Sequence, residues 1–414
     1  MKKPLEVKTL EEARSKFSRY WEPNRQTEKV SITEAGGRIL AGDVKSKIDL
    51  PPFDRSVYDG YAVRAEDTFG AEEDNPVKLH LKGKILAGQK PEIEIDSNEC
   101  LEISTGAPMP WGADAVVMVE DTSIDDAGKV KVRNAVSSKE NVSEKGSELE
   151  KGQRIVSSDT EISPQVYGSL LACGTKNVSV YRKPRVGVIS IGEELVDMDS
   201  ELEIGKIYDI NGPTISRAVR ELGSRSSYLG ILKDEIEEMK REIGKALADF
   251  DIVITSGATS AGSSDFLPEV VKNLGDPGVV VHGLAQKPGK PTLMAVVKDK
   301  PLFGLPGYPV SALMVFYRVV APYLREMSCG LSLDRKIVEA HLSRKTTSEP
   351  GRRELVPVSL SKKNGMRIAT PLRKGSGAIT SLSKSDGCFV IPLGIEMMDA
   401  DEIVDVELFG EVLP

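Results

Sequence analysis

The chain has 414 residues, of which 40% are hydrophobic and 29% are charged, a composition typical of folded proteins. Because domains average roughly 150 residues, we expect a segmented molecule of about three domains. The formal net charge of -8 lacks the basic excess of nucleic-acid-binding proteins, so nucleic acid is not an expected partner.

The start of the chain, its most apolar run and its cysteines predict a cytoplasmic protein. The first residues become acidic and amphipathic instead of apolar, which is unlike a secretory signal. The most apolar later run is interrupted by Arg318 and Pro322 and is too short to span a bilayer, so we expect no membrane segment. The four cysteines form no CxxC pair, which argues against a disulfide framework or a zinc site.

The first 180 residues contain two predicted helices around a β-rich region. Thr9 and Glu12 have the spacing of a capping box, and apolar residues at helical intervals predict a helix over 10–21. Short apolar runs broken by turn residues predict β structure over 44–132. A linker or a long surface excursion over 134–152 is followed by a short helix that Ser163 caps.

From residue 183 onward, strands alternate with helices, a pattern that predicts βαβ units and a mostly parallel sheet. A long helix is expected from Pro309 to about Met327, and short strands return over 330–414. The predicted elements are strands at PRVGVISIG, SYLGILKD, DIVITSG, VVVHGLA, TLMAVV and LFGLPG, with helices at PTISRAVRELG, EIEEMKREIGKALADF and DFLPEVVKNLG.

Acidic residues follow several of these strands, at the edge where parallel α/β sheets bind ligands. They are Glu193 and Glu194, Asp234 and Glu235, and Asp265. Each by itself is better explained as a cap of the following helix. Together they would repel one another in one cleft unless a divalent cation, which we expect to be magnesium, compensated their charge.

Two further stretches could bind an anion. The small, polar loop SGATSAGSSD, residues 256–265, could present backbone N–H groups at a helix N-terminus, although a tight turn explains it equally well. In QKPGKP, Lys287 and Lys290 each precede a proline, which predicts a polyproline II segment with both lysines on one side. Two solvated surface lysines are the alternative explanation.

The β-rich region contributes a second set of polar residues. PPFDRSVYDGYAV carries Asp54, Arg55 and Asp59, and ISTGAPMPWGADAVVMVE carries Thr105 and Glu120. Turn formation could explain each of them separately, but not their combination with the motifs above.

The chain resembles the molybdopterin molybdenumtransferase family, the group of MoeA and the gephyrin E domain. The resemblance covers nearly the whole chain, and its motifs stand in family order and at family spacing. They are PPFDRSVYDGYAV, STGAP with ADAVVMVE, SIGEEL, GKIYDIN, SGATSAGSSDF, QKPGKP and GLPGYPVSA.

The resemblance implies four domains. An extended first domain would comprise 1–45 and 140–180, and a β-rich second domain 46–139. A doubly wound α/β domain like MoaB and MogA would comprise 181–328, and a C-terminal β-barrel domain 329–414. The resemblance further implies an L-shaped homodimer, whose cleft would join the α/β domain of one chain to the second domain of its partner.

The resemblance also assigns site residues. Asp59 and Thr105 would come from one chain. The catalytic residues from the other chain would be Glu194, Asp234, Asp265, Lys287 and Lys290. Magnesium would be held by Glu194, Asp234 and Asp265. Substrate-binding positions would be Ser256, Gly257, Ser260, Gly262, Pro306, Pro309, Arg352 and Ser376.

Several positions depart from the family pattern. SGATSAG replaces SGGVSVG, so Ala258 stands at a glycine position; SIGEEL replaces STGDEL at Ile191; and GLPGYP replaces GLPGNP at Tyr308. Glu148 stands where an aspartate is common. Each acid is retained or replaced by another acid, so the charged set of the family is preserved.

The implied function is insertion of molybdate or tungstate into adenylylated molybdopterin, with release of AMP. The upstream adenylyltransferase is a possible partner. Two alternatives stay open: a nucleotide pyrophosphatase or deamidase of the competence-damage type, and a scaffold that binds the pterin without catalysis. Competence-damage proteins lack the preceding β-rich domain, and the retained charged residues argue against pure scaffolding.

Overall fold

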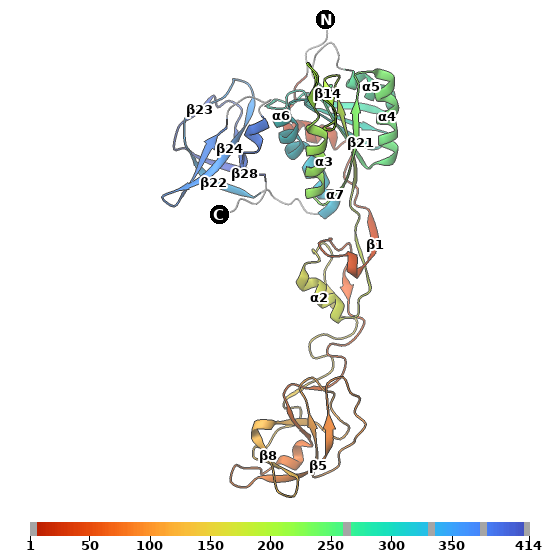
Figure 1. Ribbon diagram of the computed structural model, residues 1–414, viewed down its shortest axis with the longest axis vertical. Helices are drawn as coiled ribbons and strands as arrows, with labels where there is room; N and C mark the ends of the chain where they lie inside the picture. The colour runs from red at the N-terminus through yellow and green to blue at the C-terminus, as the bar shows by residue number, and fades with distance from the viewer. Residues whose placement is uncertain (1–5, 260–265, 330–335, 373–378, 410–414) are drawn as a thin grey trace. The chain divides into compact units, whose positions relative to one another are not determined.

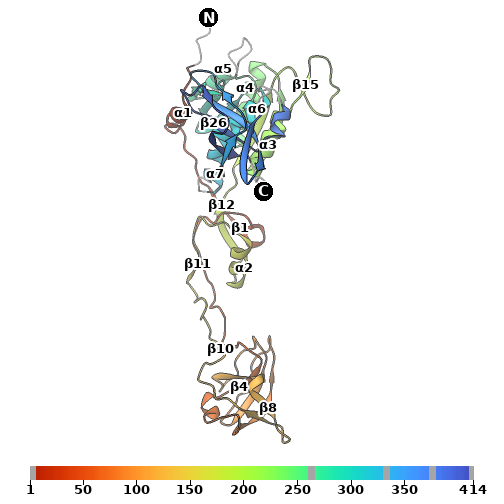
Figure 2. The same ribbon diagram turned by 90° about the vertical axis from the view of Figure 1, so that its left-hand side faces the viewer.

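The computed structural model describes residues 6–259, 266–329, 336–372 and 379–409. The chain divides into two compact units (Figures 1 and 2). Unit 1 comprises Met1–Thr27 and Tyr181–Pro414, and unit 2 comprises Glu28–Val180. Within the described ranges, no helix is long and apolar enough to cross a membrane.

Unit 2 contains the predicted β-rich region as a six-stranded sheet with the order β7-β4-β6-β5-β9-β8. Apolar side chains that alternate along the strands fill a separate core on each face, as expected for a sheet covered on both sides. The strands are β4 (Gly60–Val63), β5 (Val77–Ile85), β6 (Glu99–Ile103), β7 (Ala115–Met118), β8 (Thr122–Ile124) and β9 (Lys129–Val132).

The rest of unit 2 brings together residues from before and after this sheet. Three two-stranded pairs form, and one small core lies around α2 (Pro164–Ala172), which Ser163 caps as predicted. The pairs are β1 (Thr27–Ser31) with β12 (Asn177–Tyr181), β2 (Val44–Lys45) with β11 (Arg154–Val156), and β3 (Arg55–Ser56) with β10 (Val142–Ser143). Where the four predicted domains begin and end stays a prediction.

Unit 1 contains a six-stranded sheet with the order β16-β13-β17-β21-β20-β18. The first four strands are parallel. β20 is antiparallel to both of its neighbours, β21 and β18, so five of the six strands run in the same direction and the sheet is mostly parallel as predicted. The strands are β13 (Arg185–Ile191), β16 (Arg225–Leu232), β17 (Ile252–Ser256), β18 (Pro277–His282), β20 (Leu293–Val297) and β21 (Lys300–Leu305).

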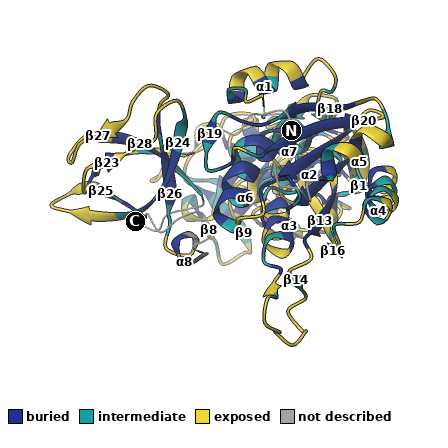
Figure 3. Cartoon of the chain, turned by 90° about the horizontal axis from the view of Figure 1, so that it is seen from above, coloured by how far each residue is buried: buried dark blue, intermediate teal, exposed yellow. Residues whose placement is uncertain are grey.

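Helices cover both faces of this sheet, which explains why its strands read as continuous apolar runs. On β13, Val186 and Val188 enter one core, whereas Ile189 and Ile191 enter the other. The first core packs against α3 (Asn211–Glu221) and α6 (Pro309–Val315), and the second against α4 (Ile236–Asp249) and α5 (Leu267–Leu274). Figure 1 shows the two pairs of helices on opposite sides of the sheet, and Figure 3 shows the buried strands between them.

The first helix is shorter than predicted. The capping box of Thr9 and Glu12 is present, but α1 covers only Leu10–Phe17 and the expected helix to residue 21 ends one turn early. Phe17 is fully buried in the core of unit 1, where its ring lies 5.5 Å from that of Phe303. Trp21, beyond the helix, packs against Phe17 and Tyr323 instead.

The predicted long helix contains a π-helical segment, Phe316–Val320, between α6 and α7 (Ala321–Cys329). Pro322 has no backbone N–H and therefore cannot donate the helical hydrogen bond to the carbonyl of Arg318. The Arg14 side chain donates to that carbonyl instead, at 2.6 Å. Pro322 thus explains an irregularity that the apolar periodicity did not indicate.

The C-terminal residues form the predicted barrel. Strands pair in the order β24-β25-β22-β28-β26, and β26 pairs again with β24, which closes the barrel. These strands are β22 (Ile337–Leu342), β24 (Arg353–Lys363), β25 (Met366–Pro371), β26 (Gly387–Ile391) and β28 (Ile403–Leu408). The short strand β19 (Gln286–Lys287) pairs with β24, so a segment after β18 joins the barrel.

Candidate functional site

A cavity of about 660 Å³ lies at the carboxyl ends of β13 and β17. β13 precedes β16 and β17 in the chain and lies between them in the sheet, so the strand order reverses there, where open α/β sheets bind ligands. The short pair β14 (Leu195–Val196) and β15 (Ile207–Tyr208) belongs to an arm that projects from the body of unit 1 (Figure 2) and contributes to the cavity.

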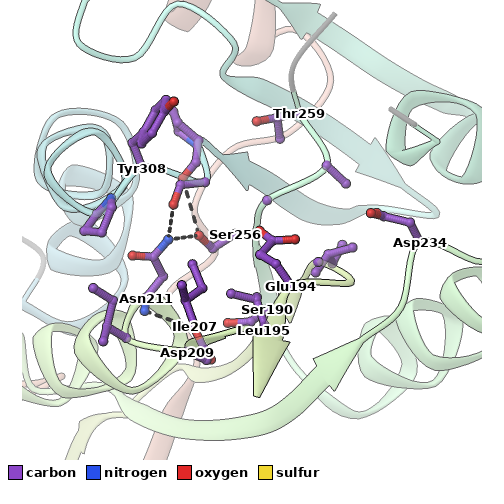
Figure 4. A pocket seen from close by; sticks show the side chains of 18 of the residues that line it. Ser190, Glu194, Leu195, Ile207, Asp209, Asn211, Asp234, Ser256, Thr259 and Tyr308 are labelled. Atoms are coloured by element: carbon purple, nitrogen blue, oxygen red, sulfur yellow. Dashed lines mark hydrogen bonds between the residues drawn. The ribbon is translucent and has the colours of Figure 1, made fainter. Parts of the chain in front are cut away.

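One side of the cavity is held by Asn211 at the start of α3 (Figure 4). Its side-chain amide donates to the hydroxyl of Ser256 at 2.9 Å and to the carbonyl of Gly307 at 2.7 Å. Ser256 ends β17 and Gly307 follows β21, so one amide ties three segments together. Sequence analysis did not single out Asn211, although it stands in the family motif GKIYDIN.

Asp209 fixes the position of Asn211. The buried carboxylate accepts hydrogen bonds from the backbone N–H groups of Asn211 and Gly212 at 3.1 and 3.3 Å, as a helix cap does. Its second oxygen accepts from the hydroxyl of Tyr228 at 2.6 Å. Burial and this carboxylate both raise the pKa of Tyr228, so the phenol stays protonated and remains a donor.

Directly after Ser256, the backbone makes a turn against the end of β13. Gly257 has φ +98°, and a Cβ there would lie 2.1 Å from the carbonyl oxygen of Ile191, so only glycine fits. Ala258 follows with φ +52°, at the position where the family pattern has glycine. Thr259 then donates to the carbonyl of Leu305 at 3.3 Å. Ser260, Gly262 and Asp265 lie outside the described residues.

Glu194 and Asp234 line this cavity, from the ends of β13 and β16 respectively. Burial and then the negative charges of Glu194 and Glu193 raise the pKa of Asp234. Its Oδ1 atom is buried without a hydrogen-bond partner. Among the described residues, no three His, Cys, Asp or Glu side chains are grouped closely enough to hold a metal ion.

A second cavity, of about 510 Å³, contains the predicted cations Lys287, Lys290 and Arg352. This cavity lies between the end of the α/β sheet and the barrel strand β24, next to the pairing of β19 with β24. Pro291, Pro306 and Tyr308 line both cavities, so the two adjoin. Pro309 lines the first cavity, and Ser376 lies outside the described residues.

The predicted polyproline II conformation of QKPGKP is wrong. Lys287 belongs to β19, and Gly289 has φ +112°, which a polyproline II helix does not allow. Both lysines nevertheless line the same cavity, because pairing with the barrel and the turn at Gly289 bring them there.

A carboxylate that the sequence did not reveal pairs with two of the cations that line this cavity. Glu349 accepts a hydrogen bond from the ammonium group of Lys287 at 2.8 Å and forms an ion pair with Arg352 at 3.2 Å. The hydrogen bond from Lys287, and then its positive charge, hold the pKa of Glu349 below its usual range. The only sequence signal was its place three residues before Arg352.

Asp59 and Thr105 lie together in unit 2. The backbone N–H and the hydroxyl of Thr105 donate to Asp59 Oδ1 at 2.7 and 3.1 Å, and these bonds lower the pKa of Asp59. Asp59 ends the loop before β4 and Thr105 begins the turn after β6, and both are exposed. Asp54 accepts a hydrogen bond from the backbone N–H of Lys145 at 2.7 Å, which is a structural role because it joins two segments that are far apart in the sequence.

Comparison with known proteins identifies the class. Three family models match in order: the MoeA N-terminal region (domain I and II) over residues 8–174, a "Probable molybdopterin binding domain" over 187–326, and the MoeA C-terminal region (domain IV) over 339–409. The β-rich region, the α/β sheet and the closed barrel, in this order along the chain, are therefore those of a molybdenum cofactor biosynthesis protein.

The chain belongs to the MoeA family. It is 33% identical to the molybdopterin molybdenumtransferase of Staphylococcus epidermidis, covering 92% of this chain and 90% of the relative. It is 32% identical to that of Bacillus subtilis, with 95% and 92% covered. A crystal structure of a molybdopterin biosynthesis MoeA protein from Pyrococcus horikosii superimposes with a TM-score of 0.85 at 40% identity, covering 98% of this chain and 100% of that one.

Proposed function

We propose that this chain inserts molybdate or tungstate into adenylylated molybdopterin and releases AMP, in the cytoplasm. The observation that carries this proposal is the pair of adjoining cavities, one lined by carboxylates and the other by three cations. The proposed substrate carries phosphate groups, and the proposed co-substrate is a tetrahedral oxyanion. Family membership supports this chemistry over the competence-damage and scaffold alternatives.

In the cationic cavity, Lys287, Lys290 and Arg352 neutralise the charge of the phosphate or the oxyanion. Fixed charges of this kind stabilise a transition state because they need no reorganisation as the reaction proceeds. In the first cavity, the backbone of Ser256 and Gly257 lies beside the carboxylates and positions the substrate. The prolines Pro306 and Pro309 hold the adjoining wall rigid.

Glu194 and Asp234, with Asp265 from outside the described residues, would hold magnesium. Asp234 supports the fit of this site to a magnesium ion, because its buried Oδ1 lacks a hydrogen-bond partner and its ionisation is opposed by burial and by neighbouring carboxylates. A divalent cation removes that electrostatic penalty and accepts oxygen ligands of this type. When bound, it would neutralise charge on the phosphate oxygens.

Asp59 and Thr105 would act on the reacting end of a substrate bound in a partner chain, within a homodimer. Their exposure and their mutual hydrogen bonds support this role, because the pair is formed in advance and faces solvent. The upstream adenylyltransferase is proposed as a further partner, since it would supply the adenylylated pterin.

The decisive experiment measures AMP release from adenylylated molybdopterin by the purified protein with magnesium. Three reactions are compared: with molybdate, with tungstate and without oxyanion. Release that an oxyanion stimulates, with active cofactor formed, would support the proposal and identify the preferred metal. Oxyanion-independent hydrolysis would favour a pyrophosphatase, and binding without any release would favour a scaffold.

A further inference from the structure

Tyr308 is an aromatic residue that neither the local fold nor the packing of unit 1 requires. It stands at the N-cap of α6, where Asn, Asp, Ser and Thr are preferred because their side chains bond to free N–H groups of the first turn. Tyr308 makes no such bond. Its side chain is not buried either, since the residue is 64% exposed. Asparagine, which the family pattern has here, could cap the helix.

The position of Tyr308 points to a ligand. It lines both cavities, with Pro291 and Pro306 beside it. The carboxylates Glu194 and Asp234 line only the first cavity, and the cations line only the second. Figure 4 shows Tyr308 and Asp234 at opposite sides of the first cavity. The ring therefore stands where a substrate with a flat part and charged ends would pass from one cavity to the other.

We propose that Tyr308 is a stacking platform for a flat heteroaromatic ring of the substrate, and so a specificity-determining residue of this chain. An exposed tyrosine gives up little packing when a heterocycle covers it, and the contact removes apolar surface of both rings from water. The two rings of the proposed substrate, adenine and the pterin, share this chemistry. The inference rests on the proposed function for the identity of the ring.

The test compares three variants by titration calorimetry with AMP, with molybdopterin under anaerobic conditions, and with ribose 5-phosphate. Tyr308→Phe keeps the ring, Tyr308→Leu keeps apolar bulk without it, and Tyr308→Asn installs the family residue. We expect Tyr308→Leu and Tyr308→Asn to weaken binding of one ring-bearing ligand about tenfold, within the range of base stacking on aromatic side chains. Tyr308→Phe should bind like the wild type, and ribose 5-phosphate, which has no ring, should be unaffected.

Two features make the result decisive. Tyr308→Asn should raise Tm by roughly 1–2 °C through the new cap while it weakens binding, and a purely structural role of the tyrosine would not separate the two effects in this way. If the Tyr308→Leu and Tyr308→Asn variants lose affinity for AMP, adenine is the stacked ring. If they lose affinity for molybdopterin, the pterin is the stacked ring. If Tyr308→Leu binds both ligands within twofold of wild type, the proposal is wrong. Because the readout is binding, it stands apart from the AMP-release test of the proposed function.

Discussion

At the scale of single residues, Glu349 sets how strongly the cationic cavity attracts anions. Its carboxylate neutralises Lys287 and Arg352, so an incoming oxyanion has to displace it. These ion pairs are exposed, and the interaction free energy of an exposed pair is only about 0.2–1 kcal/mol. We therefore predict that Glu349→Gln raises the affinity for molybdate or tungstate roughly two- to fivefold at low ionic strength, measured by calorimetry.

A matched control for this prediction is Glu339→Gln, which removes an exposed carboxylate from β22 of the same barrel. It changes the net charge equally, whereas only Glu349 forms ion pairs with Lys287 and Arg352, two cations that line the cavity. Equal oxyanion affinities of the two variants would contradict a specific role of Glu349.

Asp234 should destabilise the metal-free protein at neutral pH. Its folded pKa is raised by burial and by Glu194 and Glu193, so above the unfolded-state pKa the charge favours unfolding. We predict that Asp234→Asn raises Tm at pH 7, and that the gain shrinks towards pH 4, near the usual aspartate pKa of about 3.9. Thermal scans of both proteins across this pH range measure the effect.

Magnesium supplies the second readout for Asp234. A ligand that binds only the folded state raises stability, so magnesium should raise Tm of the wild type and should raise that of Asp234→Asn less. AMP release by the variant should fall on the order of 10²-fold or more. An equal magnesium response in both proteins would show that Asp234 is not a metal ligand.

At the scale of elements, the turn after β17 decides whether the first cavity forms. Gly257→Ala places a Cβ against the carbonyl of Ile191 at a positive φ, so we expect a loss of about 3 kcal/mol or more of unfolding free energy. Gly223→Ala is the control, since Gly223 also has a positive φ but no atom within 4 Å of the added Cβ. That variant should lose only about 1 kcal/mol. If denaturant titrations give similar losses of unfolding free energy for the two variants, the close approach to Ile191 is not the cause of the destabilisation.

At the scale of the whole molecule, the proposed dimer predicts complementation between inactive variants. Each cleft of the proposed dimer takes Asp59 from one chain and Asp234 from the other, so the Asp59→Asn and Asp234→Asn substitutions remove residues that different chains contribute. After dissociation and mixing in equal amounts, half of the dimers would be mixed, each with one intact cleft, so about a quarter of wild-type AMP release should return. If both residues served a cleft within one chain, mixing would restore nothing. The mass in solution, from light scattering, should be twice the 44.9 kDa of the chain.

Local sequence patterns predicted most elements of this protein. The alternation of strands and helices after residue 183, the capping box at Thr9 and the cap at Ser163 all appear as expected, because each depends on residues a few positions apart. The ordered motifs also identified the family. Four of the site residues that this resemblance implied, Glu194, Asp234, Lys287 and Lys290, line the two cavities of the structure. What these residues do in catalysis stays a prediction.

Only the tertiary structure decided the contacts between distant segments. The amide of Asn211 meets Ser256 and Gly307, Glu349 meets Lys287, and Arg14 meets the carbonyl that Pro322 leaves free. Such contacts depend on strand order, on closure of the barrel and on which side chain reaches a given backbone group. Periodicity and residue type record the preferences of a segment and which of its faces is apolar, whereas the partner of that face is determined by the packing of the whole unit.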